Sequence, residues 1–206
     1  MAGAMYARLV SLKWRLLNPV IFVHINKTGG SSVEHALGLK FAHLTAREHI
    51  ARLGRTRWER AFTFSIVRNP WDKVVSHYQY RVDTNQTNLR DSPISFRDWV
   101  RLSYGDRDPK YFDKPKMFMP QRDWLTDESG TIAVDYIGRF EHLEQDFSTV
   151  CEQLGTTAKL PHMKKSKRGD CRDYYDDETA EIVARVFAED IDEFGYRFEI
   201  PSRVIQ

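Results

Sequence analysis

The sequence predicts an α/β protein, because short apolar segments suited to buried strands are followed three times by segments with helical spacing. The strand-like segments, each with the helix-like segment that follows it, are 20–25 and 31–37, 61–67 and 70–78, and 131–140 and 141–154. Residues 131–140 suit a hairpin as well as a single strand. The chain has 206 residues, of which 41% are hydrophobic, so it can bury a sizeable core as one large domain or as two small ones. We expect a single domain over residues 1–206, in which 1–19 form a helical lead-in.

Composition and charge narrow the functional classes. The net charge is only +2, but basic residues cluster within 47–60 and 164–172, and such clusters suit an anionic nucleotide or a polyanion, or form solvated faces. Cys151 and Cys171 lack the spacing of a zinc site or a disulfide framework, which indicates a reducing compartment, and we expect a cytoplasmic protein. No apolar run approaches the roughly 20 residues that a membrane-spanning helix needs.

The first strand-to-helix junction has the composition of a phosphate-binding loop. The apolar run 20–25 is followed by residues that favour a tight turn and then a helix, which we expect to begin at Ser31 or Ser32. Glycines let the backbone approach a ligand closely, and a helix N-terminus offers N–H groups and a positive dipole to an anion. A glycine-containing turn without a ligand is the alternative interpretation. The residues assigned to the loop are Lys27, Thr28, Gly29, Gly30, Ser31 and Ser32.

The order of residues in this loop differs from the common nucleoside-triphosphate loop, G-x-x-x-x-G-K-[ST]. In that loop the lysine comes late and the hydroxyl residue after it holds Mg²⁺. Here Lys27 precedes both glycines. The order therefore argues against an NTPase of that kind and predicts an anion that is bound without a metal ion.

The segment after the first helix bears a candidate histidine. Residues 39–44 alternate enough to predict a short strand. Thr45 then opens a capping-box pattern, which predicts a helix that ends near Gly54. This arrangement would place His43 at the C-terminal end of a strand, where ligands bind in open parallel sheets.

The second strand-to-helix junction predicts another phosphate contact. Asn69 suits a helix N-cap and Pro70 suits the first helical position, so the helix is expected to begin directly after Arg68. Ser76 lies about two turns into this helix, at 3.6 residues per turn. A guanidinium and a hydroxyl held by two rigid elements can grip one phosphate. The alternative is a capped helix with an incidental arginine and a solvent-facing serine.

The middle of the chain predicts an irregular region. Residues 83–128 are rich in polar, turn-forming and aromatic residues, and only 95–102 within them have a helical pattern. Long irregular segments are usually functional or mobile, so this region is a candidate insertion on the acceptor side. Residues 117–121 could form one wall of an acceptor pocket, although packing in the core explains them as well.

The last third of the sequence predicts scaffold and one basic loop. The helix over 141–154 is amphipathic and ends at Gly155, and a further helix is expected over 177–194. Between them, the basic residues of 162–172 could close over a nucleotide or form a solvated turn. Lys167 and Arg168 are the candidate ligands in this loop.

Four segments resemble parts of sulfotransferases that use 3′-phosphoadenosine 5′-phosphosulfate (PAPS) as the donor. His-Ile-Asn-Lys-Thr-Gly-Gly-Ser-Ser at 24–32 resembles their 5′-phosphosulfate loop, H-I-P-K-T-G-G-[ST]-S, with asparagine in place of proline. Residues 68–76 resemble the motif that holds the 3′-phosphate, and 137–147 resemble a scaffold stretch of small bacterial members. Residues 43–48 are similar to the histidine-bearing segment of carbohydrate and glycosaminoglycan-type sulfotransferases.

This resemblance implies a P-loop-like α/β domain with a mainly parallel central sheet flanked by helices. It implies transfer of a sulfuryl group from PAPS to an acceptor hydroxyl, with a saccharide favoured and with no metal ion, nucleic acid or transmembrane segment involved. Residues 27–32 would then hold the phosphosulfate, with Lys27 stabilising the transferring group, and Arg68 and Ser76 would hold the 3′-phosphate. Lys167 and Arg168 weakly resemble a loop that contacts the same phosphate, and His43 would be the general base.

Two other functional classes remain open from the sequence. A nucleotide-dependent small-molecule kinase would share the strand, loop and helix, and it would require Mg²⁺. A non-catalytic polyanion-binding module would use the basic clusters and bind polymers with strong salt dependence. The identity of the acceptor and the oligomeric state are not specified by any of these motifs.

Overall fold

The computed structural model describes residues 19–161 and 169–198, and the chain divides into two compact units. Val67 ends the first segment of the first unit, and Arg68 begins the second unit. Of the described residues, the first unit holds 19–67 and 123–161, and the second holds 68–122 and 169–198. Residues 1–18 of the predicted lead-in, together with Lys167 and Arg168, lie outside the described residues.

The first unit is built on a parallel sheet of three strands. The strands are β1 (Val20–Val23), β2 (Phe62–Val67) and β3 (Tyr136–Arg139), in the order β1-β2-β3. β2 pairs in parallel with both neighbours, so that Val20 lies opposite Phe62 and Phe64 lies opposite Tyr136. The predicted α/β fold class with a parallel sheet is therefore confirmed.

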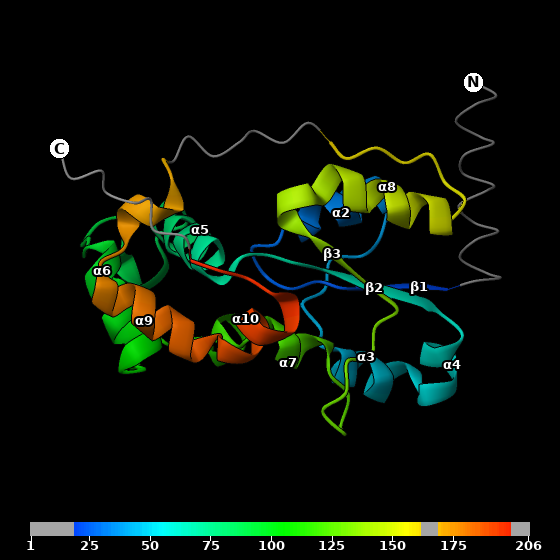
Figure 1. Cartoon of the computed structure of the whole chain (residues 1–206), viewed down its shortest axis with the longest axis horizontal. Helices are drawn as coiled ribbons and strands as arrows, with labels where there is room; N and C mark the ends of the chain where they lie inside the picture. The colour runs from blue at the N-terminus through cyan, green and yellow to red at the C-terminus, as the bar shows by residue number, and fades with distance from the viewer. Residues whose placement is uncertain (1–18, 162–168, 199–206) are drawn as a thin grey trace. The chain divides into compact units, whose positions relative to one another are not determined.

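Helices cover both faces of this sheet. In Figure 1, α2 (Gly30–Leu37) and α8 (Leu143–Gln153) lie on one face, and α3 (Ala46–Leu53) and α4 (Arg55–Glu59) lie on the other. The core between the sheet and the first pair of helices consists of large apolar side chains with little exposed surface. These are Phe22, Val33, Phe64, Ile66, Phe147, Val150, Cys151 and Leu154.

The predicted boundaries of the first two helices are close to the observed ones. α2 begins at Gly30, slightly earlier than expected, because Gly29 takes the N-cap position, and Gly38 ends the helix in the left-handed conformation. Thr45 caps α3 through the expected capping box with Glu48.

The predicted strand over 39–44 is wrong, so His43 lies in an irregular connection and not at a strand end. Backbone groups that a sheet ladder would need are used locally. The N–H of Leu39 donates to the backbone oxygen of Glu34 (2.8 Å), and the N–H of Ala42 donates to Oε1 of the same residue (3.3 Å). Phe41 is 65% exposed, so the alternating pattern does not bury an apolar face.

Residues 131–140, predicted as a strand or a hairpin, contain a strand that is shorter than expected. Only four residues pair with β2, and Ile132 forms an isolated antiparallel bridge with Thr126 before them. A 3₁₀ turn, Phe140–His142, then leads into α8. The amphipathic helix predicted after this strand is confirmed, but its first predicted residues belong to the 3₁₀ turn and the α-helix begins at Leu143.

The second unit is helical within the described residues. Its main helices are α5 (Pro70–Asp83), α6 (Phe96–Val100), α9 (Asp177–Val186) and α10 (Ala188–Phe194). Shorter helical turns are Gln86–Asn88, Arg101–Gly105, Pro115–Phe118 and Cys171–Tyr174, and α7 (Gln121–Leu125) begins in this unit and ends in the first. The region 83–128 is therefore a series of short helices and turns. The helix predicted over 177–194 is interrupted at the buried Phe187.

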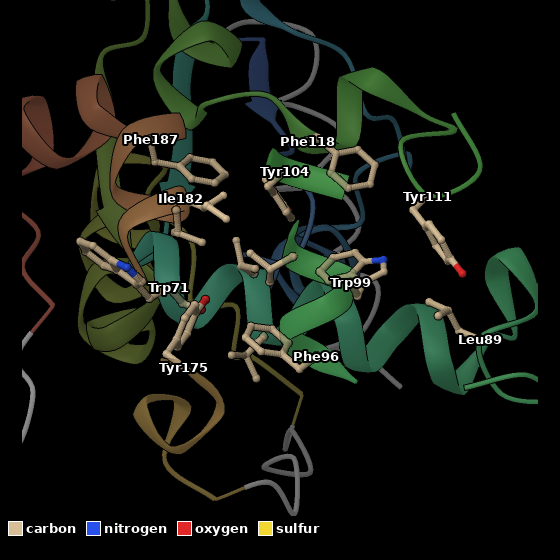
Figure 2. Packing of buried hydrophobic residues seen from close by; sticks show 14 residues of the cluster. Trp71, Leu89, Phe96, Trp99, Tyr104, Tyr111, Phe118, Tyr175, Ile182 and Phe187 are labelled. Carbon is tan, nitrogen blue, oxygen red and sulfur yellow. The ribbon is translucent and has the colours of Figure 1, made fainter. Parts of the chain in front are cut away.

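The core of the second unit is strongly aromatic. Figure 2 shows Trp99 between Phe96 and Phe118, with Tyr104 and Phe187 nearby. Trp99 and Tyr104 meet edge to face, with ring centres 5.6 Å apart, a favourable geometry for aromatic pairs. Phe118 is 3% exposed, so this part of the segment 117–121 packs in the core.

Within the described residues, no helix has both the length and the apolar character needed to cross a bilayer.

Candidate functional site

The loop between β1 and α2 has a backbone suited to binding an anion. Lys27 has a φ of 67° and Gly29 a φ of 82°, whereas Thr28 between them has a negative φ. Alternation of this kind turns successive N–H groups toward the same side of the chain, and such concave backbone segments bind anions. A positive φ is unusual for lysine, and this backbone strain is typical of functional loops.

The side chains of this loop differ in what they can offer a ligand. The hydroxyl of Thr28 is fully buried and donates to the backbone oxygen of Ile25 (2.9 Å), so it stabilises the turn. Lys27 is half-buried, Ser31 is exposed and Ser32 is buried at the start of α2. The structure therefore gathers the predicted loop residues in one turn, with Thr28 in a supporting place.

The two glycines of the loop are required for different reasons. Gly29 needs its positive φ, and an added Cβ would lie 3.0 Å from a methyl group of Leu143. A Cβ on Gly30 would lie 2.1 Å from Cδ2 of His24, which is a severe overlap. Gly30 thus leaves room for a histidine ring against the start of α2.

His24 and Glu34 form a buried polar pair beneath the loop, which the sequence did not predict as part of the site. Nδ1 of His24 lies 3.0 Å from Oε1 of Glu34, and the two residues are 3% and 5% exposed. Burial, reinforced by the neighbouring His43, lowers the pKa of His24 to about 3. Burial also raises the pKa of Glu34 to about 7, against the effect of the Ala42 hydrogen bond. His24 is therefore neutral at neutral pH.

His43 is held in one orientation by the backbone next to the loop. Its Nδ1 lies 2.8 Å from the backbone oxygen of His24. Because a carbonyl oxygen can only accept, Nδ1 carries the proton, and in the neutral ring the lone pair is on Nε2. The ring packs 4.3 Å from that of His24 and 4.8 Å from that of the exposed Phe41, measured between centres. A half-buried histidine in this tautomer can accept a proton at Nε2.

The second predicted motif begins the second unit. Asn69 accepts from the N–H of Trp71 (3.1 Å), and Pro70 is the first residue of α5, as predicted. Arg68 is 6% exposed, and its guanidinium pairs with Oδ2 of Asp72 at 2.6 Å. Ser76 is half-buried in α5. The predicted phosphate-binding arginine is thus pre-oriented by a carboxylate one turn later in the helix.

Gln121 and Asp190 hold the backbone of Arg68, a role that the sequence did not predict for either residue. Oε1 of Gln121 accepts from the N–H of Arg68 (2.9 Å), and its Nε2 donates to the Arg68 oxygen (2.8 Å). Asp190 in turn accepts from the N–H of Gln121 (2.8 Å) and from its Nε2 (3.1 Å). These partners are 53 and 69 residues apart in sequence, so no local pattern could have revealed the network.

Lys73 adds a buried cation beside this network. Its ammonium group is fully buried and has no hydrogen-bond partner among the residues that the structure describes. It lies 5.2 Å from the centre of the Phe187 ring. Burial lowers the pKa of Lys73 to about 8, an effect that Asp190 opposes and Arg68 reinforces.

Comparison with known proteins identifies the family. Residues 18–197 match a protein-family model described as Sulfotransferase family, and the match includes the 27–32 loop and the 68–76 motif. The chain belongs to the sulfotransferase family. Membership implies sulfotransfer as the activity, with a nucleotide donor and a hydroxyl acceptor.

Other comparisons add little chemical detail about this sulfotransferase. A protein of Archaeoglobus fulgidus, described only as an uncharacterized protein, is 32% identical to it over 114 residues. The aligned part covers 53% of this chain and 80% of that protein. No solved structure matches the sulfotransferase.

Proposed function

We propose that this sulfotransferase moves a sulfuryl group from PAPS to a hydroxyl group of a saccharide, with His43 as the general base. The observation that carries the donor assignment is the alternating backbone at 27–29, directly before α2. The cytoplasmic location remains a prediction from cysteine usage.

The donor would be bound through its two anionic ends. In this proposal residues 27–32 hold the 5′-phosphosulfate through backbone N–H groups and the Lys27 ammonium, which compensates the charge that develops on the leaving phosphate. Arg68 and Ser76 hold the 3′-phosphate. The pairing of Arg68 with Asp72 supports this role because it fixes the guanidinium before the ligand arrives. Lys167 and Arg168 stay predicted ligands of the same phosphate.

The chemistry at the acceptor would depend on His43. Nε2 of the neutral ring takes the proton of the acceptor hydroxyl, whose oxygen forms a bond to sulfur as the bond between sulfur and the 5′-phosphate oxygen breaks. The products are a sulfate ester, adenosine 3′,5′-bisphosphate and an imidazolium that returns its proton to solvent. The hydrogen bond from Nδ1 to His24 supports this role, because it selects the tautomer with a lone pair at Nε2. The saccharide is proposed on the likeness of residues 43–48 to glycosaminoglycan-type enzymes.

Nucleotide binding provides the first test of the donor. Isothermal titration should give tight binding of adenosine 3′,5′-bisphosphate with the same affinity with and without Mg²⁺. Binding of ATP that requires Mg²⁺, with no binding of the bisphosphate, would favour the kinase alternative and overturn the proposal.

Removal of one phosphate at a time assigns each motif to one end of the donor. Arg68→Ala should weaken bisphosphate binding by about 10 to 100-fold, the value of a charge-assisted hydrogen bond, and leave adenosine 5′-monophosphate unchanged. Lys27→Ala should weaken both nucleotides. Arg57→Ala removes an exposed arginine of α4 and serves as the matched control. If Arg68→Ala weakens both nucleotides equally, Arg68 does not read the 3′-phosphate.

Replacement of the base tests the chemical step. His43→Ala should abolish most transfer from PAPS to an unsulfated glycosaminoglycan oligosaccharide, while bisphosphate binding stays within about twofold, because a general base contributes about 10² to 10⁴-fold to rate. Unchanged turnover in this variant would refute the assignment of His43.

A second candidate, a non-catalytic polyanion-binding module, is favoured by one feature of the first unit. Arg55, Arg57 and Arg60 line a hollow of about 470 Å³ next to Pro19, at the N-terminal end of β1. Arg55 is paired with Asp127 (3.0 Å). A module of this kind would bind a sulfated polymer with steep salt dependence and would ignore the free nucleotide. The titrations above therefore separate the two functions.

A further inference from the structure

We propose that Glu34 is a positioning residue for the general base His43, acting through Ala42 and His24. The inference rests on the proposed function and assigns a role in it to a residue of α2 that binds neither donor nor acceptor. The inference is carried by two contacts of the Glu34 side chain. One is with Ala42, which precedes His43 in the chain, and the other is with His24, which accepts the hydrogen bond of His43.

Glu34 anchors the irregular connection that bears His43 at two points. Its backbone oxygen accepts from the N–H of Leu39 (2.8 Å), where the connection leaves α2. Its Oε1 accepts from the N–H of Ala42 (3.3 Å), the residue immediately before His43. One residue of a rigid helix therefore holds both ends of the segment 39–42. No sheet ladder fixes that segment.

The same carboxylate oxygen also lies against His24. Oε1 of Glu34 is 3.0 Å from Nδ1 of His24. The backbone oxygen of His24 in turn accepts the hydrogen bond from Nδ1–H of His43 (2.8 Å). Glu34 thus contacts both the residue that precedes the base and the residue that selects its tautomer. A displacement of either would reorient the lone pair on Nε2.

The burial of Glu34 argues against a purely incidental contact. The Glu34 side chain is 5% exposed and its Oε2 has no hydrogen-bond partner among the described residues, so burying this carboxyl group is costly, and burial raises its pKa to about 7. An apolar side chain would fill a helix position against the sheet at lower cost. The polar group is instead placed where it ties α2, the end of β1 and the base-bearing connection together.

The orientation of His43 can be tested by spectroscopy without an acceptor. In protein labelled with ¹⁵N-histidine, long-range proton–nitrogen spectra should show His43 with Nδ1 protonated and Nε2 unprotonated in the wild type. Glu34→Ala should convert this signal into an average of both tautomers. Glu34→Gln should restore the wild-type signal, because the amide oxygen can still accept from Ala42.

Turnover gives the second readout, and Glu48 supplies the matched control. Its carboxylate also accepts a backbone N–H in the same part of the chain, that of Thr45 (2.7 Å), but it belongs to the capping box of α3. With PAPS and the oligosaccharide acceptor, Glu34→Ala should lower kcat about 10 to 100-fold with bisphosphate affinity unchanged, the effect of a misplaced catalytic group. Glu48→Ala should lose stability but keep its kcat.

The outcomes separate the positioning role of Glu34 from the role of His43 as general base. If His43→Ala is inactive and Glu34→Ala keeps both the single tautomer and its kcat, Glu34 has no positioning role although the proposed function stands. If kcat of Glu34→Ala falls no further than kcat of Glu48→Ala, the inference is likewise overturned. If His43→Ala remains active, the base assignment fails and this inference fails with it.

Discussion

Replacing Gly30 by alanine is expected to destabilise the protein by about 2 kcal/mol, because the added methyl group would collide with His24. The new Cβ would lie 2.1 Å from Cδ2, 2.3 Å from Nε2 and 2.8 Å from Cγ of that ring. Contacts between carbon atoms are optimal at about 3.5 to 4.0 Å, so the closest overlap exceeds about 1 Å. Overpacking of this kind typically costs about 1 to 3 kcal/mol. Alanine in a helix would otherwise be favoured over glycine by up to about 1 kcal/mol.

The ring of His24 cannot move aside cheaply. It is 3% exposed and packs against Phe22, Phe41 and His43, with ring centres 5.5, 5.3 and 4.3 Å away. Any rotation also separates Nδ1 from the carboxylate of Glu34, now 3.0 Å away. The strain therefore stays in the folded state.

A double-mutant cycle isolates the collision from other effects of the substitution. Urea unfolding followed by tryptophan fluorescence should give the free energy of unfolding for Gly30→Ala, His24→Ala and the double variant. In the His24→Ala background the Gly30 substitution should be neutral or slightly stabilising, so the coupling is about 2 kcal/mol or more. Gly105→Ala is the control, since its Cβ would meet Ile182 at an ordinary 3.5 Å. Additive effects within about 0.5 kcal/mol would refute the steric argument.

Three further predictions concern stability. Lys73→Met should remove a pH dependence: the folded-state pKa of about 8 lies below the ordinary value of 10.5, so the wild type gains stability as pH rises from about 8 toward 10.5. The free energy of unfolding should rise by up to about 3 kcal/mol over this range. If urea unfolding at each pH gives the variant and the wild type the same pH dependence, the prediction is wrong. Gln121→Leu removes both hydrogen bonds that the side chain makes with the buried backbone of Arg68 and should cost about 2 to 4 kcal/mol, measured as a lower urea midpoint; a loss below about 1 kcal/mol would show that water replaces the amide. Thr45→Ala should cost about 1 kcal/mol by removing the capping box with Glu48, and a calorimetric melting temperature equal to that of the wild type would argue against it.

The parts of the fold that follow from local chemistry were predictable. Asn69 and Pro70 fixed the start of α5, the Thr45 capping box fixed α3, and Gly38 ended α2. In each case a few adjacent residues satisfy backbone groups or supply a rare backbone angle, so the signal lies within a short stretch of sequence.

The prediction of a strand over 39–44 was wrong because a strand depends on partners outside its own stretch of sequence. Alternation indicates a strand only if a neighbouring strand receives its backbone groups, and here Glu34 of α2 takes two of them. The irregular connection that results bears His43. The candidate base was therefore predicted as a residue, but its structural setting was not.

Most residues of the candidate site could be predicted from the sequence, whereas the residues that hold them in place could not. The order of lysine, glycines and hydroxyl residues at 27–32 indicated an anion-binding loop, and the positive φ of Lys27 is consistent with it. The fully buried hydroxyl of Thr28, directed to Ile25, shows that one predicted ligand side chain stabilises the turn.

The sequence by itself determined the three strand-to-helix units, the caps at Thr45 and Asn69 and the two motifs, because these depend on neighbouring residues. Only the tertiary structure decided that Gly30 makes room for His24, that Glu34 reaches Ala42, and that Gln121 holds Arg68. These contacts join residues that are distant along the chain, and the free energy of a buried polar group depends on the partner that folding brings to it.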